Sequence, residues 1–353
     1  MIKILHIYKT FIPETMGGVE QCILQMSKNP KIQSRVLCLT PKNERSVSVV
    51  EGVEVVRYPQ TLSYASCPIS LQALLHFRQE AEWADIIHYH YPWPFADLLF
   101  LFAGKKKSVV TYHSDIVKQK LLRLLYYPLE QYFLAKMDRI IATSPNYAKT
   151  SPNLLKYKDK AEIIPIGIDY GSYPKAKPEK KYGDRFFLFI GQLRYYKGLD
   201  VLFEAIAGTD LQLVVIGDGP SRAKLAKTHK NVHFLGQVDE QQKSNLLAAC
   251  LCVVLPSHLR SEAFGIALVE GAMFDKPLIC CEIGTGTSHI NKHMETGLVV
   301  PPNDASALRA AMLKMLGDQK LAKKMGQAAK NRYNEFFTAK TMRDRLTKLY
   351  KSL

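Results

Sequence analysis

The chain has 353 residues, of which 47% are hydrophobic and 23% are charged, and its formal net charge is +16. This length exceeds that of one typical compact domain and suits two domains of about 170 residues, each with a substantial core. No uninterrupted apolar run of roughly 18 residues and no signal-peptide pattern occur. These features argue against a membrane-spanning or secreted protein, and we expect a cytoplasmic one.

Strand-like and helix-like segments alternate along the chain. In the first half, we expect strands at residues 2–8, 34–39, 53–57, 86–90, 108–112, 139–143 and 162–164. We expect helices between them at residues 19–27, 71–82, 94–102, 120–135 and 145–155. After a linker rich in Pro, Lys and Gly at 170–183, strands are expected at 186–190, 212–216, 232–234, 252–255, 277–281 and 297–300. Helices are expected at 199–207, from 264 onward, at 308–333 and at 338–353. This alternation predicts an α/β protein with parallel sheets that helices cover on both faces.

The seven cysteines do not form a recognisable metal motif. Cys250, Cys252, Cys280 and Cys281 lie in apolar, strand-like segments, which is typical of reduced and buried thiols. The Cys-x-Cys pair at 250 and 252 lacks a second Cys or His pair at zinc-like spacing. We therefore expect no metal site.

Two carboxylates eight positions apart flank the start of an apolar helix. Glu262 precedes Phe264 and Gly265, and Glu270 falls inside the helix. At about 1.5 Å per residue the two carboxylates are roughly 12 Å apart along the chain, close to the length of a nucleotide sugar from hexose to ribose. The amides at the helix start favour a phosphate between them. The plainer alternative is one solvated glutamate and one locally paired glutamate.

Two cations lie in the loop after the apolar strand 186–190. Arg194 and Lys197 stand between that strand and the next helix, so they belong at the carboxyl end of a parallel sheet, where ligands of such sheets bind. A bidentate Arg and a point-charge Lys together suit a leaving diphosphate and would neutralise it without a metal. The alternative is two solvated loop cations.

Further candidates lie at strand ends of the first half. Gly17 and Gly18 begin a helix after the first strand and would let the backbone approach a phosphate, although a simple turn explains them too. His113 comes directly after the strand ending at Tyr112, again on the expected ligand side. Asp115, two residues on, orients a neighbouring group or starts the next helix.

An aromatic segment follows the strand at 86–90. His90 and Trp93 lie in this segment, Tyr89 to Phe95. Aromatic faces suit the apolar faces of a pyranose, so both residues are candidate contacts for an acceptor sugar. They fit a hydrophobic core equally well.

Taken together, segments 191–198 and 262–270 closely resemble the signature of retaining glycosyltransferases of family 4. The resemblance extends over nearly the whole chain and includes segments 17–20, 111–115, 164–169 and 296–300. It implies the GT-B fold, in which two Rossmann-like domains face each other. It also implies an acceptor-side domain at 1–168, a nucleotide-sugar domain at 169–336 and a last helix at 337–353 that packs back on the first domain.

The resemblance also implies a front-face transfer that retains the anomeric configuration, with no metal and no cofactor. A double displacement is the weaker alternative, since it needs a nucleophilic carboxylate beside the anomeric carbon. In the implied scheme His113 contacts the donor sugar and diphosphate, and Arg194 and Lys197 stabilise the departing diphosphate. Glu262 holds the sugar hydroxyls and Glu270 the ribose hydroxyls. Phe264 and Gly265 offer backbone amides.

One segment departs from the family pattern. Many members carry Gly-Gly-x-x-Glu after the strand at 277–281, whereas this chain has Thr285 and Gly286 within segment 282–288 and lacks the glutamate. Thr285 and Gly286 are expected to supply hydroxyl and amide donors to phosphate. The variant resembles bacterial mannosyltransferases that build O-antigen or exopolysaccharide, which favours GDP-mannose as donor and a lipid-linked glycan as acceptor. A nucleotide-sugar epimerase of the same fold and a non-catalytic nucleotide-sugar-binding protein remain open.

The positive charge calls for an anionic partner. An amphipathic, aromatic segment at 121–134 is bracketed by basic residues. These residues are Lys105 to Lys107, Lys118, Lys120, Arg123 and Lys136. A basic helix of this kind is a plausible dock for an anionic bilayer, which would place the protein on the inner face of the cytoplasmic membrane. A core helix with a solvated basic face is the alternative. Nucleic acid is not expected, because no recognised binding module occurs.

Overall fold

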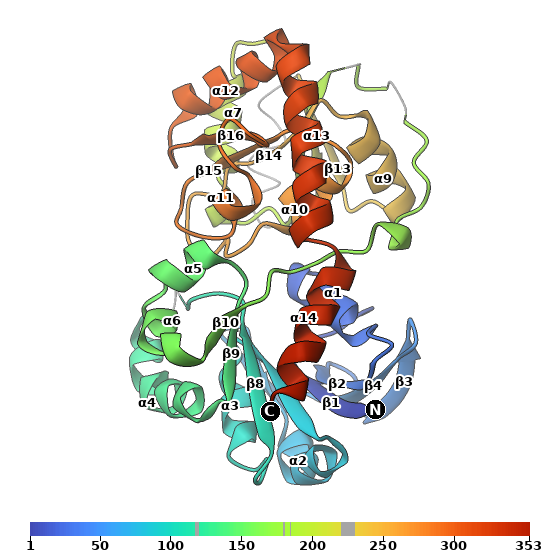
Figure 1. Cartoon of the computed structure of the whole chain (residues 1–353), viewed down its shortest axis with the longest axis vertical. Coiled ribbons are helices and arrows are strands. Elements are labelled where there is room, and N and C mark those ends of the chain that lie inside the picture. The colour runs from blue at the N-terminus through green and yellow to red at the C-terminus, as the bar shows by residue number, and fades with distance from the viewer. Residues whose placement is uncertain (117–119, 179–180, 184, 220–229) are drawn as a thin grey trace. The chain divides into compact units, whose positions relative to one another are not determined.

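The structure, a computed structural model, describes residues 1–116, 120–178, 181–183, 185–219 and 230–353. Its chain forms two compact units (Figure 1). The first unit contains Met1–Gly167 together with Ala339–Leu353, and the second contains Ile168–Thr338. Each unit is an α/β structure built on a mainly or wholly parallel sheet, as the alternation of elements predicts.

The first unit is built on an eight-stranded sheet in the order β10-β9-β8-β7-β1-β2-β4-β3. Its strands are β1 (Ile2–Ile7), β2 (Ile32–Thr40), β3 (Ser46–Val50), β4 (Val53–Pro59), β7 (Ile86–Tyr91), β8 (Lys107–Tyr112), β9 (Arg139–Ala142) and β10 (Ala161–Ile163). All neighbours pair in parallel except β3, which pairs antiparallel with β4. β5 (Leu62–Tyr64) and β6 (Cys67–Ile69) form a separate small hairpin. The sequence did not predict β3, because this edge strand is mostly exposed and has no buried apolar run.

Seven helices of the described residues belong to the first unit. They are α1 (Gly18–Ser27), α2 (Leu71–Trp83), α3 (Pro94–Phe100), α4 (Lys120–Lys136), α5 (Pro145–Thr150), α6 (Pro152–Lys156) and α14 (Ala339–Lys351). The expected helix at 145–155 is two helices, because Pro152 has no amide to continue α5 and instead occupies the first turn of α6.

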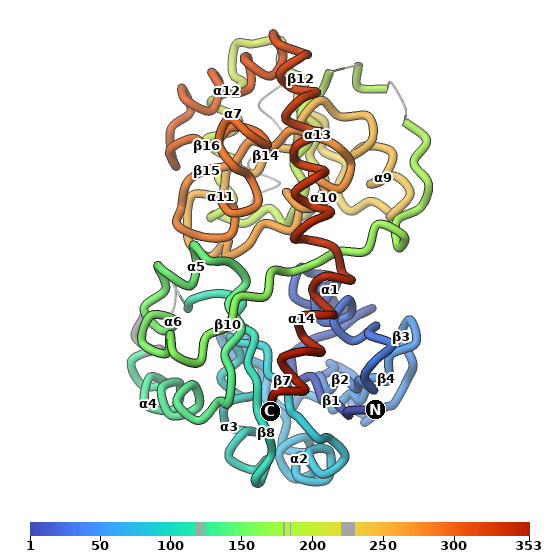
Figure 2. The backbone as a smooth tube through the Cα atoms, viewed as in Figure 1, coloured from blue at the N-terminus to red at the C-terminus, as the bar shows by residue number. Residues whose placement is uncertain are grey.

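Helix α14 lies beside α1 and completes the first unit (Figure 2). The Arg343 side chain donates to the backbone oxygen of Gln25 at 2.7 Å and to its side-chain oxygen at 3.0 Å. The Asn29 amide donates to Thr347 Oγ1 at 2.8 Å. Helix α14 is therefore part of the first unit, although it follows the second unit in the chain.

The second unit contains a wholly parallel six-stranded sheet in the order β13-β12-β11-β14-β15-β16. Its strands are β11 (Phe186–Ile190), β12 (Gln212–Ile216), β13 (Val232–Gly236), β14 (Cys252–Leu255), β15 (Leu278–Cys281) and β16 (Gly297–Val300). Its described helices are α7 (Leu199–Ile206), α9 (Glu240–Ala249), α10 (Ile266–Met273), α11 (Thr287–Ile290), α12 (Ala305–Gly317) and α13 (Gln319–Phe336). This is the strand order of a Rossmann fold. From β11 the chain adds strands first on one side (β12, β13) and then on the other (β14, β15, β16), so the topological switch point lies between β11 and β14. A ligand is expected beyond the carboxyl ends of these two strands.

No helix in the described ranges is long and apolar enough to cross a membrane. The seven cysteines carry free thiols, and all are buried except Cys67, which is half-buried. Burial raises the pKa of the Cys250 thiol to about 11, so this group is a poor metal ligand at neutral pH.

Candidate functional site

The loop after β11 is held against the loop after β14 at the switch point of the second sheet. The link is Gly198, which has φ +70°, and a Cβ atom there would lie only 2.1 Å from the backbone oxygen of Pro256. Only glycine fits this close approach in the left-handed region. The contact fixes the short 3-10 turn Tyr195–Lys197, which carries Lys197, next to the segment that leads to Glu262.

Lys197 and Glu262, which the sequence places 65 residues apart, form an ion pair in this site. The two side chains are each only 12% exposed. Ser257 Oγ also donates to Glu262 Oε2, at 3.0 Å. Burial lowers the pKa of Lys197, but the negative charge of Glu262 outweighs it, so this pKa lies above its usual value. Lys197 therefore remains a cation, while the nearby Arg194 side chain is exposed and accessible to a ligand.

The segment between Glu262 and α10 presents unused backbone donors. Gly265 has φ +98° and caps the start of α10. The amides of Phe264 and Gly265 have no hydrogen-bond partner within the described part of the chain. They add to the partial positive charge of the helix start, and this makes the segment suitable for an anion.

The Thr285 hydroxyl and the Gly286 amide, two of the donors expected to bind phosphate, are engaged within the protein. The Thr285 hydroxyl donates to the backbone oxygen of Glu262 at 2.7 Å, and the Gly286 amide donates to that of Ala263 at 2.8 Å. Both residues are buried. These two groups therefore hold the Glu262 segment in place. The backbone amide of Thr285 has no partner among the described residues, and phosphate binding at Thr285 stays a prediction.

Glu270, on α10, belongs to a second buried cluster. Its Oε1 accepts from the Tyr173 hydroxyl at 2.7 Å and pairs with Lys243 Nζ at 2.9 Å. Lys243 also pairs with Glu240 at 2.9 Å, and although burial lowers its pKa, the two carboxylates raise it overall. Among the described residues Glu270 Oε2 has no partner, so this oxygen is available to accept from a ligand. Tyr173 and Lys243 did not emerge from the sequence, because neither lies in a recognisable motif.

In the first unit, Gly17 and Gly18 lie at the start of α1, as expected. Gly17 is the N-cap, and a Cβ atom there would lie 2.5 Å from Glu20 Oε2. Glu20 is buried, accepts from the Thr10 hydroxyl at 2.6 Å and has a raised pKa, chiefly through burial. Gly17 therefore leaves room for the Glu20 carboxylate at the helix start. The sequence did not indicate this role for Glu20.

His113 lies just beyond β8, and its Nε2 is 2.9 Å from Nδ1 of His90. It is 7% exposed, and burial lowers its pKa to about 3, so its ring is neutral. His90 is fully buried and therefore cannot contact an acceptor sugar in this arrangement.

Trp93 and Asp115 also have structural partners. Trp93 is 1% exposed, and its Nε1 donates to the backbone oxygen of Pro68 at 3.0 Å. The Asp115 carboxylate accepts from the Tyr112 hydroxyl at 2.9 Å and from Ser151 Oγ at 2.7 Å. Trp93 therefore belongs to the interior of the first unit and, like His90, cannot contact an acceptor sugar in this arrangement. Asp115 is half-buried, and its role as an acceptor contact stays a prediction.

Two family models match consecutive parts of the chain. The model described as "Glycosyltransferase Family 4" matches residues 16–171, and the one described as "Glycosyl transferases group 1" matches residues 174–332. D-rhamnosyltransferase WbpZ of Pseudomonas aeruginosa is 47% identical over 96% of this chain and 93% of its own length. O-antigen chain mannosyltransferase C of Escherichia coli is 44% identical over 100% of this chain and 99% of its own.

Solved structures match the fold over the full length. Sucrose-phosphate synthase from Thermosynechococcus elongatus has a TM-score of 0.80 at 20% identity and covers 100% of this chain and 99% of its own. Anabaena HepE in complex with UDP and glucose has a TM-score of 0.80 at 19% identity and covers 100% of both chains. These similarities show a common architecture of two Rossmann-like domains.

Proposed function

The chain belongs to glycosyltransferase family 4 and has the GT-B fold, and we propose that it moves a hexose, with retention of configuration, from a nucleotide sugar to a lipid-linked glycan. The observation that carries this proposal is the largely buried Lys197–Glu262 pair, with each side chain 12% exposed, at the switch point of the second sheet. A fixed cation beside a fixed carboxylate suits a substrate that has a diphosphate next to a sugar with free hydroxyls.

In the proposed reaction, the bond from the anomeric carbon to the diphosphate oxygen breaks, and a bond to the acceptor oxygen forms on the same face. The acceptor proton passes to the leaving diphosphate. Negative charge grows on that diphosphate, where Lys197, Arg194 and the amides of Phe264 and Gly265 would stabilise it. Glu262 would accept hydrogen bonds from the sugar hydroxyls and hold the anomeric carbon in line. No metal takes part in this scheme.

The nucleoside end of the donor would bind at Glu270. Its Oε2 would accept hydrogen bonds from the two ribose hydroxyls, while Tyr173 and Lys243 hold Oε1. In the first unit, we assign donor contacts to His113 and to the backbone at Gly17 and Gly18.

The donor sugar is proposed to have the manno configuration. The relatives are named for transfer of D-rhamnose, which is a 6-deoxymannose, and of mannose in an O-antigen chain. GDP-mannose and its 6-deoxy form are thus the first donors to test, with synthesis of a bacterial surface polysaccharide as the biological setting.

A panel of nucleotide sugars tests this choice. GDP-mannose or GDP-D-rhamnose should raise the melting temperature more than UDP-glucose or ADP-glucose at equal concentration. A larger shift with UDP-glucose would refute the donor assignment. Incubation with donor alone separates the alternatives, because an epimerase would convert the sugar without an acceptor. A non-catalytic binder would keep its cellular function when Glu262 is replaced by Ala, whereas the transferase would lose it.

An anionic membrane is the proposed partner surface of the first unit. On α4, Leu124 is 73% and Leu125 is 82% exposed, and Leu101 and Phe102, after the adjacent helix α3, are also exposed. Lys105, Lys107 and Lys136 supply exposed positive charge nearby in the sequence. Lys118 and the side chains of Lys120 and Arg123 lie outside the described residues. Exposed apolar side chains among cations favour an anionic bilayer, where a lipid-linked acceptor would reside.

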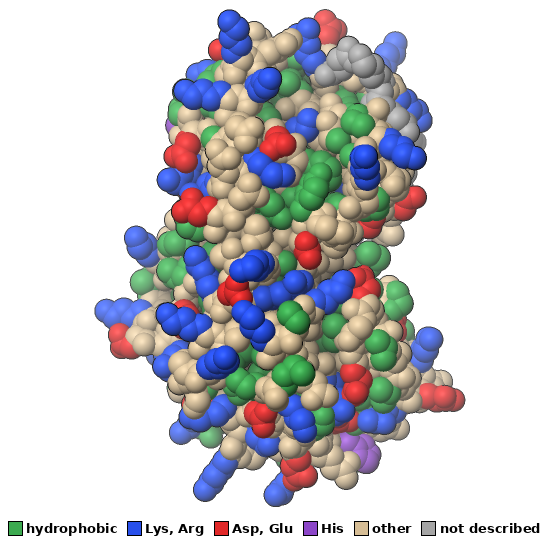
Figure 3. Space-filling view, turned by 45° about the vertical axis from the view of Figure 1, so that its right-hand side comes forward, with side chains coloured by type: hydrophobic (Ala, Val, Ile, Leu, Met, Phe, Trp, Pro, Cys, Tyr) green, Lys and Arg blue, Asp and Glu red, His purple; other side chains and the backbone are tan. Residues whose placement is uncertain are grey.

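Lysines and arginines are dispersed over the face shown in Figure 3, with acidic and apolar side chains among them. The membrane proposal therefore rests on α4 and not on total charge. Sedimentation with phosphatidylglycerol vesicles should drop when Leu124 and Leu125 are both replaced by Ser. Leu75, on α2 and 79% exposed, provides the control, because its replacement by Ser should leave binding unchanged. Equal sedimentation of the double variant and the wild type would contradict the proposal.

A further inference from the structure

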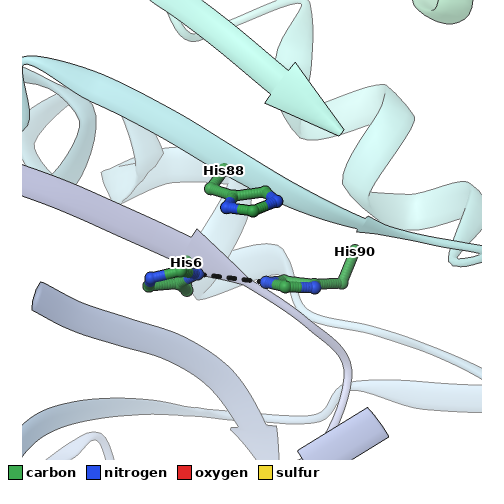
Figure 4. Close-up of side chains that lie close together, drawn as sticks. All are labelled: His6, His88 and His90. Carbon is green, nitrogen blue, oxygen red and sulfur yellow. Dashed lines mark hydrogen bonds between the residues drawn. The ribbon is translucent and has the colours of Figure 1, made fainter. Parts of the chain in front are cut away.

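Four histidines lie on one side of the first sheet, at the carboxyl ends of its central strands. His6 on β1 is the register partner of His88 on β7, and His90 follows two residues later on the same face. His113 comes directly after β8. His6, His88 and His90 lie close together (Figure 4) and are fully buried, and His113 is nearly so. The residues therefore form one compact, buried cluster.

Three of these rings form a continuous hydrogen-bonded chain. His6 Nδ1 lies 3.1 Å from His90 Nε2 (Figure 4), and His90 Nδ1 lies 2.9 Å from His113 Nε2. Burial lowers the pKa of all three rings, so each is neutral and carries one N–H and one lone pair. The protons must then all point toward His113 or all point toward His6.

The environment of His6, at one end of the three hydrogen-bonded rings, decides which way the protons point. His6 Nε2 is buried and has no partner. If the protons pointed toward His6, this nitrogen would carry an orphaned N–H, which is rarer in protein interiors than an unpaired acceptor and is costly to bury. The favoured arrangement therefore has His6 donating to His90 and His90 donating to His113 Nε2, which leaves the proton of His113 on Nδ1.

We propose that His6 and His90 are positioning residues that hold His113 as the neutral Nδ1–H tautomer, so that His113 donates a hydrogen bond to an oxygen of the donor substrate. This inference rests on the proposed function, in which His113 contacts the donor. Nδ1 of His113 has no partner within the described part of the chain. With Nε2 accepting from His90 and Nδ1 protonated, His113 has no lone pair for a proton, and it acts as a hydrogen-bond donor and not as a general base.

A metal ion is the competing occupant of this cluster. The nearest ligand atoms of His6, His88 and His90 lie within 4.8 Å of one another. However, both ring nitrogens of His88 are engaged, by the Tyr350 hydroxyl at 2.6 Å and by Thr111 Oγ1 at 2.7 Å. Both nitrogens of His90 are engaged as well. Metal binding would break several of these bonds, whereas in the hydrogen-bonded arrangement His6 Nε2 is the one unpartnered ring nitrogen among His6, His88 and His90.

The first test is nitrogen NMR on protein with labelled histidine. In the donor-free wild type, His113 should show a protonated Nδ1 and an unprotonated Nε2. The opposite pattern, or stoichiometric binding of Zn²⁺ that removes the histidine signals, would overturn the proposal. Addition of GDP-mannose should then shift the Nδ1 signal. If Nδ1 stays unmoved while the tautomer is as expected, the donor contact at His113 is refuted and the tautomer assignment stands.

Variants of His6 test the proposed orientation of the N–H protons in the three hydrogen-bonded histidines. His6→Leu removes the donor to His90 and should give mixed tautomers at His113 and a KM for the donor that is about two- to ten-fold higher, the effect of one neutral hydrogen bond. His6→Asn places an amide near the Nδ1 position and should restore both. Tyr350→Phe removes a contact of His88 alone and should change neither. An unchanged tautomer in His6→Leu, with a native melting profile, would refute the positioning role.

Discussion

Replacing Glu270 by Gln should weaken nucleotide binding strongly while it leaves the fold largely intact. The carboxylate is 5% exposed, and its Oε1 is held by Tyr173 and Lys243. Glutamine has the same shape and keeps an acceptor oxygen, but it carries no charge. Lys243 would still pair with Glu240, so the substitution does not leave a buried cation without a partner.

The size of the effect follows from the hydrogen bonds to the ribose diol. A hydrogen bond to a charged group contributes about 1.5–3 kcal/mol, and a neutral one contributes about 0.5–1.5 kcal/mol. Two donors that lose a charged acceptor would together lose roughly 1.5–3 kcal/mol of binding free energy. We therefore expect the Kd for GDP to rise on the order of 10- to 150-fold.

Isothermal titration with GDP measures this change, and Glu240→Gln is the matched control. Glu240 also pairs with Lys243, but its side chain is 42% exposed and it is not proposed to bind the ribose. A Kd for Glu270→Gln within about threefold of the wild type would show that the carboxylate serves the packing of α9 and α10 and not the nucleotide. An equal loss in Glu240→Gln would point to Lys243 instead.

Three further outcomes are expected. Lys197→Met should lower kcat by roughly 10²- to 10³-fold, because the diphosphate loses a preorganised cation, and steady-state kinetics showing less than a tenfold loss would contradict that role. Gly198→Ala should lower the melting temperature by several degrees in calorimetry, since its Cβ would lie 2.1 Å from the Pro256 oxygen, and an unchanged midpoint would show that the loop accommodates a side chain. The protein should also lose stability in acid, because burial lowers the pKa of His6 and His113 to about 3 in the folded state. Below pH of about 6.5 the same histidines are protonated in the unfolded chain but not in the folded protein, which favours unfolding. Each histidine should cost about 1.3 kcal/mol between pH 7 and 5.5, and denaturant titrations with equal midpoints at the two pH values would argue against neutral, buried rings.

The parts of the site that follow from strand ends could be predicted from the sequence. Lys197 and Glu262 come after β11 and β14, and the carboxyl ends of adjacent parallel strands meet at one edge of the sheet. The partners of Glu270 could not be predicted in this way. Tyr173 lies in a segment without periodicity, and Lys243 is on α9, whose sequence has few apolar residues to mark a buried face. Such contacts depend on tertiary packing, which local patterns do not encode.

The same limit explains why the observed partners of Thr285, Gly286 and His90 were not predicted. Hydroxyl and amide groups near a strand end can serve a ligand or a neighbouring loop, and composition does not distinguish these uses. At Thr285 and Gly286 the neighbouring loop is the partner. His90 follows the alternation of a strand that is buried on both faces, so its ring points into the interior. The family resemblance located the loops correctly, and the structure was needed to assign the individual groups.

Helix α14 affects the order in which the two units can complete their folding during synthesis. Residues 168–338 form a unit of their own, whereas the first unit needs residues 339–353 as well. On the ribosome, the later domain can therefore finish folding before the earlier one. Until α14 emerges, the surface that it will cover lacks its partner, and His88 Nδ1 lacks the Tyr350 hydroxyl. A fragment ending at residue 167 should behave as an incomplete domain and regain solubility when a peptide of residues 339–353 is supplied in trans.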